Sequence, residues 1–128
     1  MNFSKNSEDT QCQVSFQLSH SCHIVSFSGD FNYRDIQGLI SHIVNTCYAS
    51  KADLGVIFDF SAIDFLDREC FLECQKLAQM IKIMGQNTVL CGLKPGIIST
   101  LVDLEVNTQG IRTASNLENA YHILGDSP

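Results

Sequence analysis

The densest group of side chains that could do chemistry in this chain is acidic. It comprises Asp59, Asp64, Asp67, Glu69 and Glu73. Neighbouring carboxylates can act as general acid and base, or can hold magnesium. No histidine, serine nucleophile or glycine-rich phosphate loop accompanies them in a recognised pattern. Because acidic residues also favour helix starts, we interpret the group as one helix N-cap, loop turns and a solvated helix face.

Histidine and cysteine supply a second candidate, a zinc site. His20, Cys22 and His23 form a compact cluster, and Cys70 and Cys74 are spaced by one helical turn and could supply a second pair of ligands. Cys74, however, belongs to an apolar helical stripe, and neither half has the spacing of a zinc finger. We therefore expect no metal and no cofactor.

A cysteine nucleophile is the third candidate. Cys70 lies two residues after Arg68 at the expected start of a helix, where a thiol pKa is lowered. The intervening Glu69 opposes that effect, and the chain contains no dinucleotide-binding or P-loop glycine motif. We expect a protein without enzymatic activity. The remaining enzymatic alternative is a small metal-dependent hydrolase built on Asp59, Asp64 and Asp67.

Composition favours a binding module. The 128 residues carry a formal net charge of −6, with 45% hydrophobic and 17% charged residues. A negative chain without a basic run is a poor ligand for nucleic acid or for an anionic membrane. Its apolar stretches are far shorter than the roughly 20 residues that span a bilayer. The length suits a single domain with a genuine core.

The cysteines bear on the cellular compartment. There are six, at Cys12, Cys22, Cys47, Cys70, Cys74 and Cys91. Most have apolar neighbours, as in IVNTCY and VLCGL, where a free thiol behaves as a small hydrophobic side chain. Residues 1–11 are polar and lack an apolar signal core, so we expect an arm there and one domain at 12–128. Reduced thiols without a secretion signal predict a cytoplasmic protein.

Hydrophobic periodicity predicts the elements that position these residues. The pattern predicts strands at Gln13–Ser19, Cys22–Phe31, Leu54–Phe60, Thr88–Gly92 and Ile111–Thr113. It predicts helices at Tyr33–Ala49 and Arg68–Met84, a third opened by Lys94-Pro95-Gly96, and a last one at 114–124. Asp67 is the expected N-cap of the second helix and Gly85 its stop, and Ser115 with Glu118 has capping-box spacing.

The order of these elements predicts the fold class. The first two strands are close enough to form a β-hairpin, and strands then alternate with helices. Right-handed crossovers place such strands in a mostly parallel sheet of about five strands, flanked by about four helices. The third helix should cover the sheet with an apolar face made of Ile97, Ile98, Leu101, Val102 and Leu104. The sequence therefore predicts an α/β domain.

Residues 56–124 resemble the STAS domains, the sulfate-transporter and anti-sigma-factor-antagonist modules. The resemblance is carried by VIFDFSAIDFLD, MGQNTVLCGLKPGIISTLVDL and GIRTASNLENAYHIL. It points to the stressosome branch, in which a strand leads to an acidic loop and a later glycine-containing turn ends in proline. The corresponding pieces here are Leu66-Asp67-Arg68 and Gly92-Leu93-Lys94-Pro95. Residues 14–50 agree with these domains in topology alone.

The resemblance implies a phosphorylation switch at the start of the second helix. In such domains a partner kinase phosphorylates a serine or threonine there, and about −2 charges at a helix N-terminus change protein docking. The residue after Asp67 is Arg68, which cannot accept phosphate and, being positive, does not mimic phosphoserine. We expect the usual switch to be missing, since Ser61 is too far back to replace it. Arg68 could instead pair with an acidic group or a phosphate on a neighbour.

The resemblance implies a second regulatory position in the helix after the proline turn. Thr100, with Ser99 beside it, is the candidate phospho-acceptor. We expect both residues at the edge of the apolar stripe, where a hydroxyl can reach solvent. The alternative is that Thr100 is an ordinary helix residue whose hydroxyl bonds to the backbone.

Partner docking is expected at an exposed tip where the acidic loop meets the second helix. The tip comprises Asp64, Phe65, Leu66, Arg68 and Glu69. Its two large apolar residues lie between acidic ones, so the tip combines hydrophobic and charged contacts.

The functional expectation is a non-catalytic STAS regulatory module of the stressosome type, a scaffold or anti-sigma-factor antagonist. Its expected partners are STAS-domain paralogues and a serine/threonine switch kinase, in a self-association or a large hetero-assembly, without nucleic acid or membrane. The alternative with the same fold is a stand-alone antagonist that binds an anti-sigma kinase.

Overall fold

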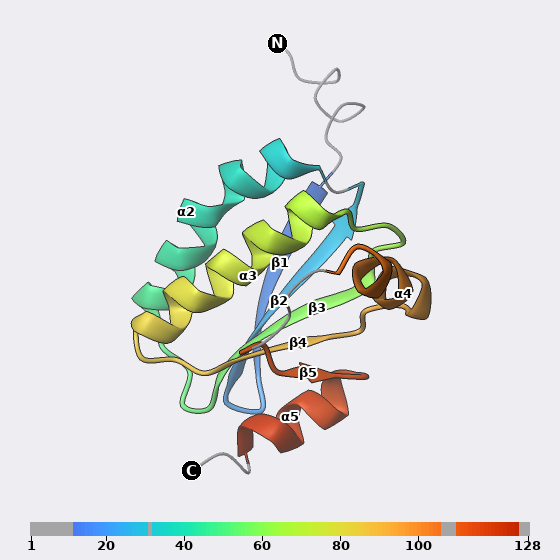
Figure 1. The fold of residues 1–128 in the computed structure, drawn as a ribbon. Coiled ribbons are helices and arrows are strands. Elements are labelled where there is room, and N and C mark those ends of the chain that lie inside the picture. The colour runs from blue at the N-terminus through green and yellow to red at the C-terminus, as the bar shows by residue number, and fades with distance from the viewer. Residues whose placement is uncertain (1–11, 31, 106–109, 126–128) are drawn as a thin grey trace.

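The computed structural model describes residues 12–30, 32–105 and 110–125 (Figure 1). The strands are β1 (Cys12–Ser19), β2 (Cys22–Gly29), β3 (Gly55–Ala62), β4 (Thr88–Cys91) and β5 (Thr113–Ala114). The helices are α2 (Tyr33–Ala49), α3 (Arg68–Ile83), α4 (Pro95–Asp103) and α5 (Leu117–Gly125). The arm expected at 1–11 lies outside the described residues.

The five strands form one sheet in their chain order, β1-β2-β3-β4-β5. β1 and β2 form an antiparallel hairpin, and every other neighbouring pair is parallel. The predicted α/β class, the mostly parallel sheet and the opening hairpin are confirmed.

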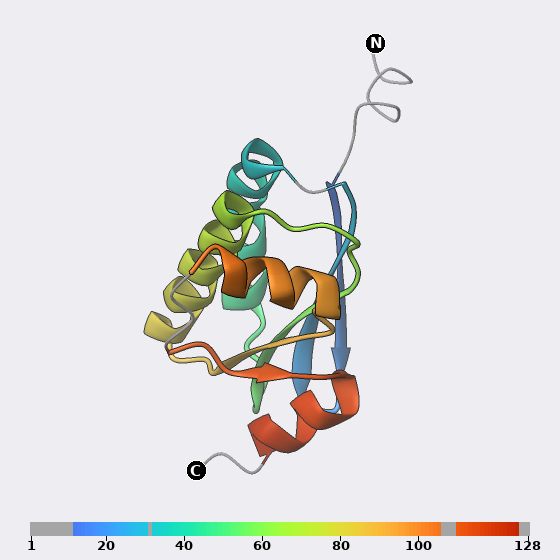
Figure 2. The same ribbon diagram turned by 45° about the vertical axis from the view of Figure 1, so that its right-hand side comes forward.

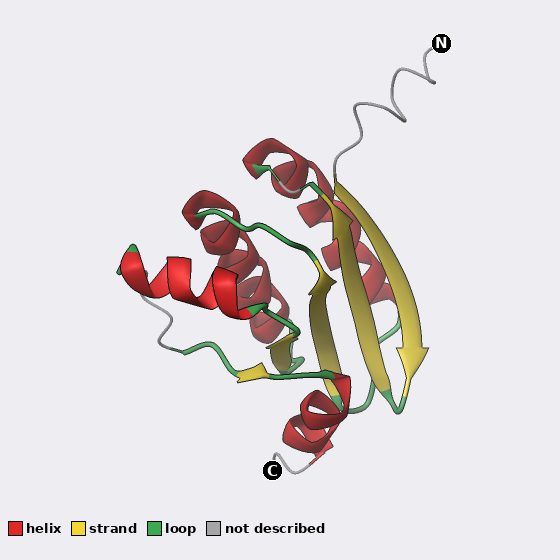
Figure 3. Cartoon of the chain, turned by 90° about the vertical axis from the view of Figure 1, so that its right-hand side faces the viewer, coloured by secondary structure: helices red, strands yellow, loops and turns green. Residues whose placement is uncertain are grey.

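Both faces of the central part of the sheet are packed, and alternate residues of β2, β3 and β4 supply the two cores. On one face α2, α3 and α4 cover the larger core (Figures 2 and 3). Within that core Phe27 stacks on Phe60 with ring centroids 5.0 Å apart. On the other face α5 covers a smaller core around Ile57 and Val89. Because β3 and β4 are covered on both sides, their sequences read as continuous apolar runs.

The C-terminal end of α2 is fastened by two buried polar side chains. The ring of His23, from β2, donates through Nε2 to the carbonyl of Ser50. Gln86, from the turn after α3, donates through Nε2 to the carbonyl of Cys47 at 3.1 Å. The last carbonyls of a helix lack partners within the helix, so these side chains satisfy them and tie α2 to the sheet.

The second helix begins and ends where the sequence predicts. The side chain of Asp67 accepts a hydrogen bond from the backbone N–H of Cys70 at 2.9 Å. Gly85, with φ of +97°, follows the helix in the left-handed conformation that ends many helices. Met84 caps α3 instead of continuing it.

The last helix begins differently from the prediction. Ser115 is not its N-cap: the carbonyl oxygen Oδ1 of Asn116 accepts from the backbone N–H of Asn119 at 2.9 Å. Ser115 instead accepts from the side-chain amide of Asn119 at 2.7 Å. The preceding strand is also shifted from the predicted 111–113 to Thr113–Ala114.

The predicted apolar face of α4 is correct for two of its five residues. Ile97 and Leu101 are buried, whereas Ile98, Val102 and Leu104 are exposed. The cause is the position of α4 at the edge of the sheet, beside a β5 strand of two residues that offers little surface to cover. Apolar surface on this helix is therefore left without a partner among the described residues.

The end of β4 lies very close to the end of β3. Gly92 has φ of +79°, and a Cβ placed there would lie 2.8 Å from the backbone nitrogen of Ser61. The backbone of Ser61 cannot withdraw without disturbing the sheet, so glycine is needed here for both conformation and space.

We expect Gly92→Ala to destabilise the protein much more than Gly85→Ala. Both changes put a side chain in the left-handed region, at about 1–2 kcal/mol, but Gly85 has open space around its Cβ position. The contact with Ser61 should add roughly 1–3 kcal/mol for Gly92→Ala. Urea unfolding of the two variants measures the difference, and equal losses would contradict the proposed close contact.

Candidate functional site

The loop between β3 and α3, residues 63–67, combines two anchored residues with two exposed ones. Ile63 and Leu66 are buried, and Leu66 is only 1% exposed. Phe65, between them, is 65% exposed, and the neighbouring Asp64 side chain also lies in solvent. The expectation that Leu66 forms part of the exposed tip is wrong, because its side chain packs in the larger core.

Lys94 holds this loop from the turn between β4 and α4. Its Nζ donates to the carbonyl of Ser61 at 2.9 Å and to the carbonyl of Ile63 at 3.0 Å. A third bond, at 3.0 Å, reaches Oδ1 of Asp64. A lysine ammonium has three protons, so this arrangement uses all of them. We call these three bonds the Lys94 clamp.

The first turn of α3 presents charges of both signs beside the exposed Phe65. Asp67 is occupied as the N-cap. The guanidinium of Arg68 and the carboxylate of Glu69 are both exposed and approach to 3.9 Å. Because an exposed pair at this distance contributes little, Arg68 stays available to a partner. Asp64, Phe65, Arg68 and Glu69 therefore share one exposed region, which we call the docking surface.

The structure does not bring the five acidic side chains of the sequence cluster together. Asp59 lies on the side of the sheet that α5 covers, where its Oδ1 accepts from the backbone N–H of Ser61 at 3.0 Å. Glu73 is buried on α3 and pairs with Lys76 at 3.3 Å. In residues 12–30, 32–105 and 110–125, no three His, Cys, Asp or Glu side chains are grouped to hold a metal.

The zinc-ligand pairs are also separated. His20 stacks on Tyr121 with ring centroids 4.2 Å apart. Cys22 lies in the core beneath α5, whereas Cys70 and Cys74 lie in the core on the opposite face of the sheet. The two pairs cannot share one ion in this arrangement.

Burial makes several thiols poor nucleophiles. Desolvation raises the pKa of Cys47 to about 11. Desolvation, together with the charge of Asp59 and a hydrogen bond to it, raises the pKa of Cys91 to about 12. Burial also raises the pKa of Cys22. These thiols are protonated at neutral pH, and it is the thiolate that reacts.

The two hydroxyls expected to regulate α4 differ in their surroundings. Ser99 is exposed. Thr100 is half-buried, and its Oγ1 donates to the carbonyl of Gly96 at 2.9 Å. Modification of Thr100 therefore has to break an existing bond, whereas modification of Ser99 does not.

Two charged residues that shape this region are missed by sequence reasoning. The sequence patterns place Lys94 only in a turn motif, and Glu73 only on a solvated helix face. The glycine-leucine-lysine-proline sequence is the one available signal for Lys94. It places a long cation just before a helix, but its three acceptors are about thirty residues earlier in the chain.

Comparison with solved structures identifies the fold as that of the STAS domains. A variant of RsbS from Moorella thermoacetica superposes with a TM-score of 0.74 at 18% identity, over 89% of this chain and 96% of that one. A chain of the stressosome, described as a signal integration and transduction hub, gives 0.71 at 18%, over 88% and 100%. Anti-sigma-factor antagonists also match, including SpoIIAA in its unphosphorylated form.

Sequence comparison points to the same group. The RsbT co-antagonist protein RsbRB of Bacillus subtilis (strain 168) is 23% identical over 107 residues, which is 82% of this chain. The match spans 38% of RsbRB, so this chain corresponds to only part of that protein. No family model matches the sequence.

None of the helices in the described residues is long and apolar enough to span a membrane.

We expect Lys94→Met to loosen the β3–α3 loop without unfolding the domain. The change keeps the aliphatic stem and removes the three bonds of the Lys94 clamp. Hydrogen exchange of the backbone amides of residues 63–67 should accelerate about fivefold or more, since roughly 1 kcal/mol of local stability is lost.

Lys82→Met is the matched control, because Lys82 lies at the other end of α3. It should leave exchange in the loop unchanged, and Lys94→Arg should restore part of the protection. Unchanged loop exchange in Lys94→Met would mean that Ile63 and Leu66 alone hold the loop.

Proposed function

We propose that this chain is a non-catalytic STAS regulatory module that binds partner proteins through the docking surface. The observation that carries the proposal is Phe65, a large apolar side chain held in solvent on a loop that is otherwise anchored. Ile63, Leu66 and the Lys94 clamp fix the loop before a partner arrives. A preorganised loop loses less conformational freedom on binding, so more of the contact energy contributes to affinity.

The charges around Phe65 supply specificity for the partner. Arg68 offers a planar guanidinium that can pair with a carboxylate or a phosphoryl group, while Glu69 is suited to a basic side chain. An exposed aromatic residue rimmed by charges is the arrangement found at the energetic centres of many protein interfaces.

The proposed partners are STAS-domain paralogues and a serine/threonine switch kinase, in a large cytoplasmic assembly. The support comes from the neighbours: a stressosome chain shares the fold, and the sequence relative is named as an RsbT co-antagonist. The same comparison supports self-association or hetero-assembly. No enzymatic step is assigned to the docking surface, because none of its four residues is a serine, threonine or cysteine nucleophile.

A second candidate function is a stand-alone antagonist of an anti-sigma kinase. The structural match to the anti-sigma-factor antagonist SpoIIAA favours it. The two functions differ in size in solution. A scaffold forms a large particle with its paralogues, whereas a stand-alone antagonist remains small and binds one kinase.

We also propose that Arg68 removes the phosphorylation switch at the start of α3. The N-cap at Asp67 is intact, so the helix start is retained while the acceptor hydroxyl is absent. In this proposal the kinase phosphorylates α4 instead, at Ser99 or Thr100. A phosphate there adds about −1.5 to −2 charges close to Asp103 and repels an acidic neighbour.

Phosphate mapping tests both statements about the switch. After incubation with a cognate kinase, the wild-type chain should carry no phosphate between Ser61 and Glu73 and should carry it at Ser99 or Thr100. Arg68→Ser should gain phosphate at position 68, and Lys82→Ser, on the same helix, should gain none. Phosphate on wild-type Ser61 would show that the switch has moved along the loop.

Substitution of Phe65 tests the docking surface. Phe65→Asp should lower partner affinity roughly thirtyfold, since an aromatic anchor contributes about 2 kcal/mol. The melting temperature should change little, because the side chain is exposed. The matched control is Ile83→Asp, which charges an 87% exposed apolar residue at the far end of α3.

The measurement is a pull-down from the native cytoplasm with identification of the bound proteins, followed by titration of each. STAS-domain proteins or a kinase that bind wild type and Ile83→Asp, but not Phe65→Asp, would support the proposal. Equal binding by wild type, Ile83→Asp and Phe65→Asp would mean that partners bind outside the docking surface.

A further inference from the structure

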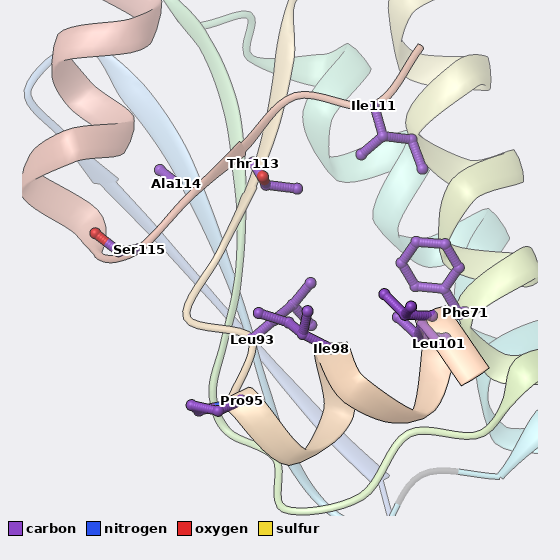
Figure 4. Close-up of a pocket in the computed structure, with 10 residues that line it drawn as sticks. Phe71, Leu93, Pro95, Ile98, Leu101, Ile111, Thr113, Ala114 and Ser115 are labelled. Carbon is purple, nitrogen blue, oxygen red and sulfur yellow. The ribbon is translucent and has the colours of Figure 1, made fainter. Parts of the chain in front are cut away.

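A cavity of about 660 Å³ lies between α4, the β5 edge and the first turn of α3 (Figure 4). Its inner wall belongs to the core, since Phe71 and Leu101 are buried. Its mouth is formed by exposed side chains of α4, with Ile98 at 47% and Val102 at 68% exposure. The volume lies within the range of about 300–1,000 Å³ typical of small-molecule sites.

The cavity exists because α4 extends beyond the covered part of the sheet. β5 contributes two residues, so the helix has no full strand beneath its outer side. Apolar side chains that would meet a neighbour in a closed core lose those contacts here. Small-molecule sites are usually concave and mostly apolar, with a few polar groups, and this cavity has that form.

The side chains around the cavity define what it can hold. None of the described residues that line it is ionisable, although the chain as a whole carries a net charge of −6. The polar side chains come from the β5 side, where Figure 4 shows Thr113 and Ser115. The Thr113 hydroxyl has a proton that it can donate to a ligand. Ser115 instead turns its hydroxyl toward α5, where the oxygen accepts from the side-chain amide of Asn119. The site therefore suits an uncharged apolar molecule with a hydrogen-bond acceptor at one end.

We propose that this cavity is a binding site for a small, uncharged, mostly apolar molecule that accepts a hydrogen bond from Thr113. The apolar body lies against Leu93, Ile98 and Phe71, and the acceptor atom faces β5. None of the residues of the docking surface lines the cavity, so the site stands independently of the docking function.

Fluorescence titration of the full chain tests the site with Nile red, an uncharged, mostly apolar dye that carries a carbonyl oxygen. One dye should bind per chain with a blue-shifted emission. Ile98→Trp should lower the affinity at least about tenfold, because the larger side chain fills the cavity from its mouth. Thr113→Val, which keeps the shape and removes the hydroxyl, should lower it roughly three- to tenfold.

Ile83→Trp is the control, because it adds the same side chain at an exposed position outside the cavity. It should bind the dye as wild type does. The anionic dye anilinonaphthalene sulfonate should bind more weakly than Nile red.

Three results would each overturn the proposal. The first is a fluorescence signal that does not saturate, or an equal loss of dye affinity in Ile98→Trp and Ile83→Trp. The second is a preference for the anionic dye. The third is a loss of dye binding as the protein concentration rises, because that would show that a second copy of the chain covers the cavity.

Discussion

The close approach of β3 and β4 at their C-terminal ends is the constraint on which the functional region depends. Gly92 allows the two backbones to meet at Ser61. Two residues later, Lys94 reaches back across the same gap to the carbonyls of Ser61 and Ile63. A side chain at position 92 would separate the strands and move the ammonium away from its acceptors. The loop that carries Phe65 and the start of α4 are therefore positioned together.

The same physical solution recurs where other elements end. Backbone carbonyls near the ends of helices and strands are bound by side chains from distant parts of the chain: His23 and Gln86 at the end of α2, and Lys94 at the end of β3 and in the loop after it. Each bond satisfies a polar group and also fixes one element against another. The apolar core determines which faces pack, and these polar contacts determine where each segment leaves the core.

Periodicity and local chemistry are sufficient to predict most of the elements. Most boundaries lie within one or two residues of the prediction, because burial imposes periods of 2 and 3.6 on strands and helices. The features that were predicted wrongly or missed depend on residues that are distant in the sequence. Leu66 looks like an exposed loop residue until the core beneath it is known, and α4 looks fully covered until β5 proves short. The Lys94 clamp joins residues about thirty positions apart, which no local pattern records.

The strand order has a consequence for how the chain folds during synthesis. Each strand pairs with the one made just before it, so no early strand waits for a partner from the far end of the chain. Sheets with strands inserted out of order need contacts of greater sequence separation, and such contacts slow folding. Here the hairpin can form first, and each later crossover adds one strand to an existing edge. The domain can therefore assemble vectorially from its N-terminus on the ribosome, with β5 completing the sheet last.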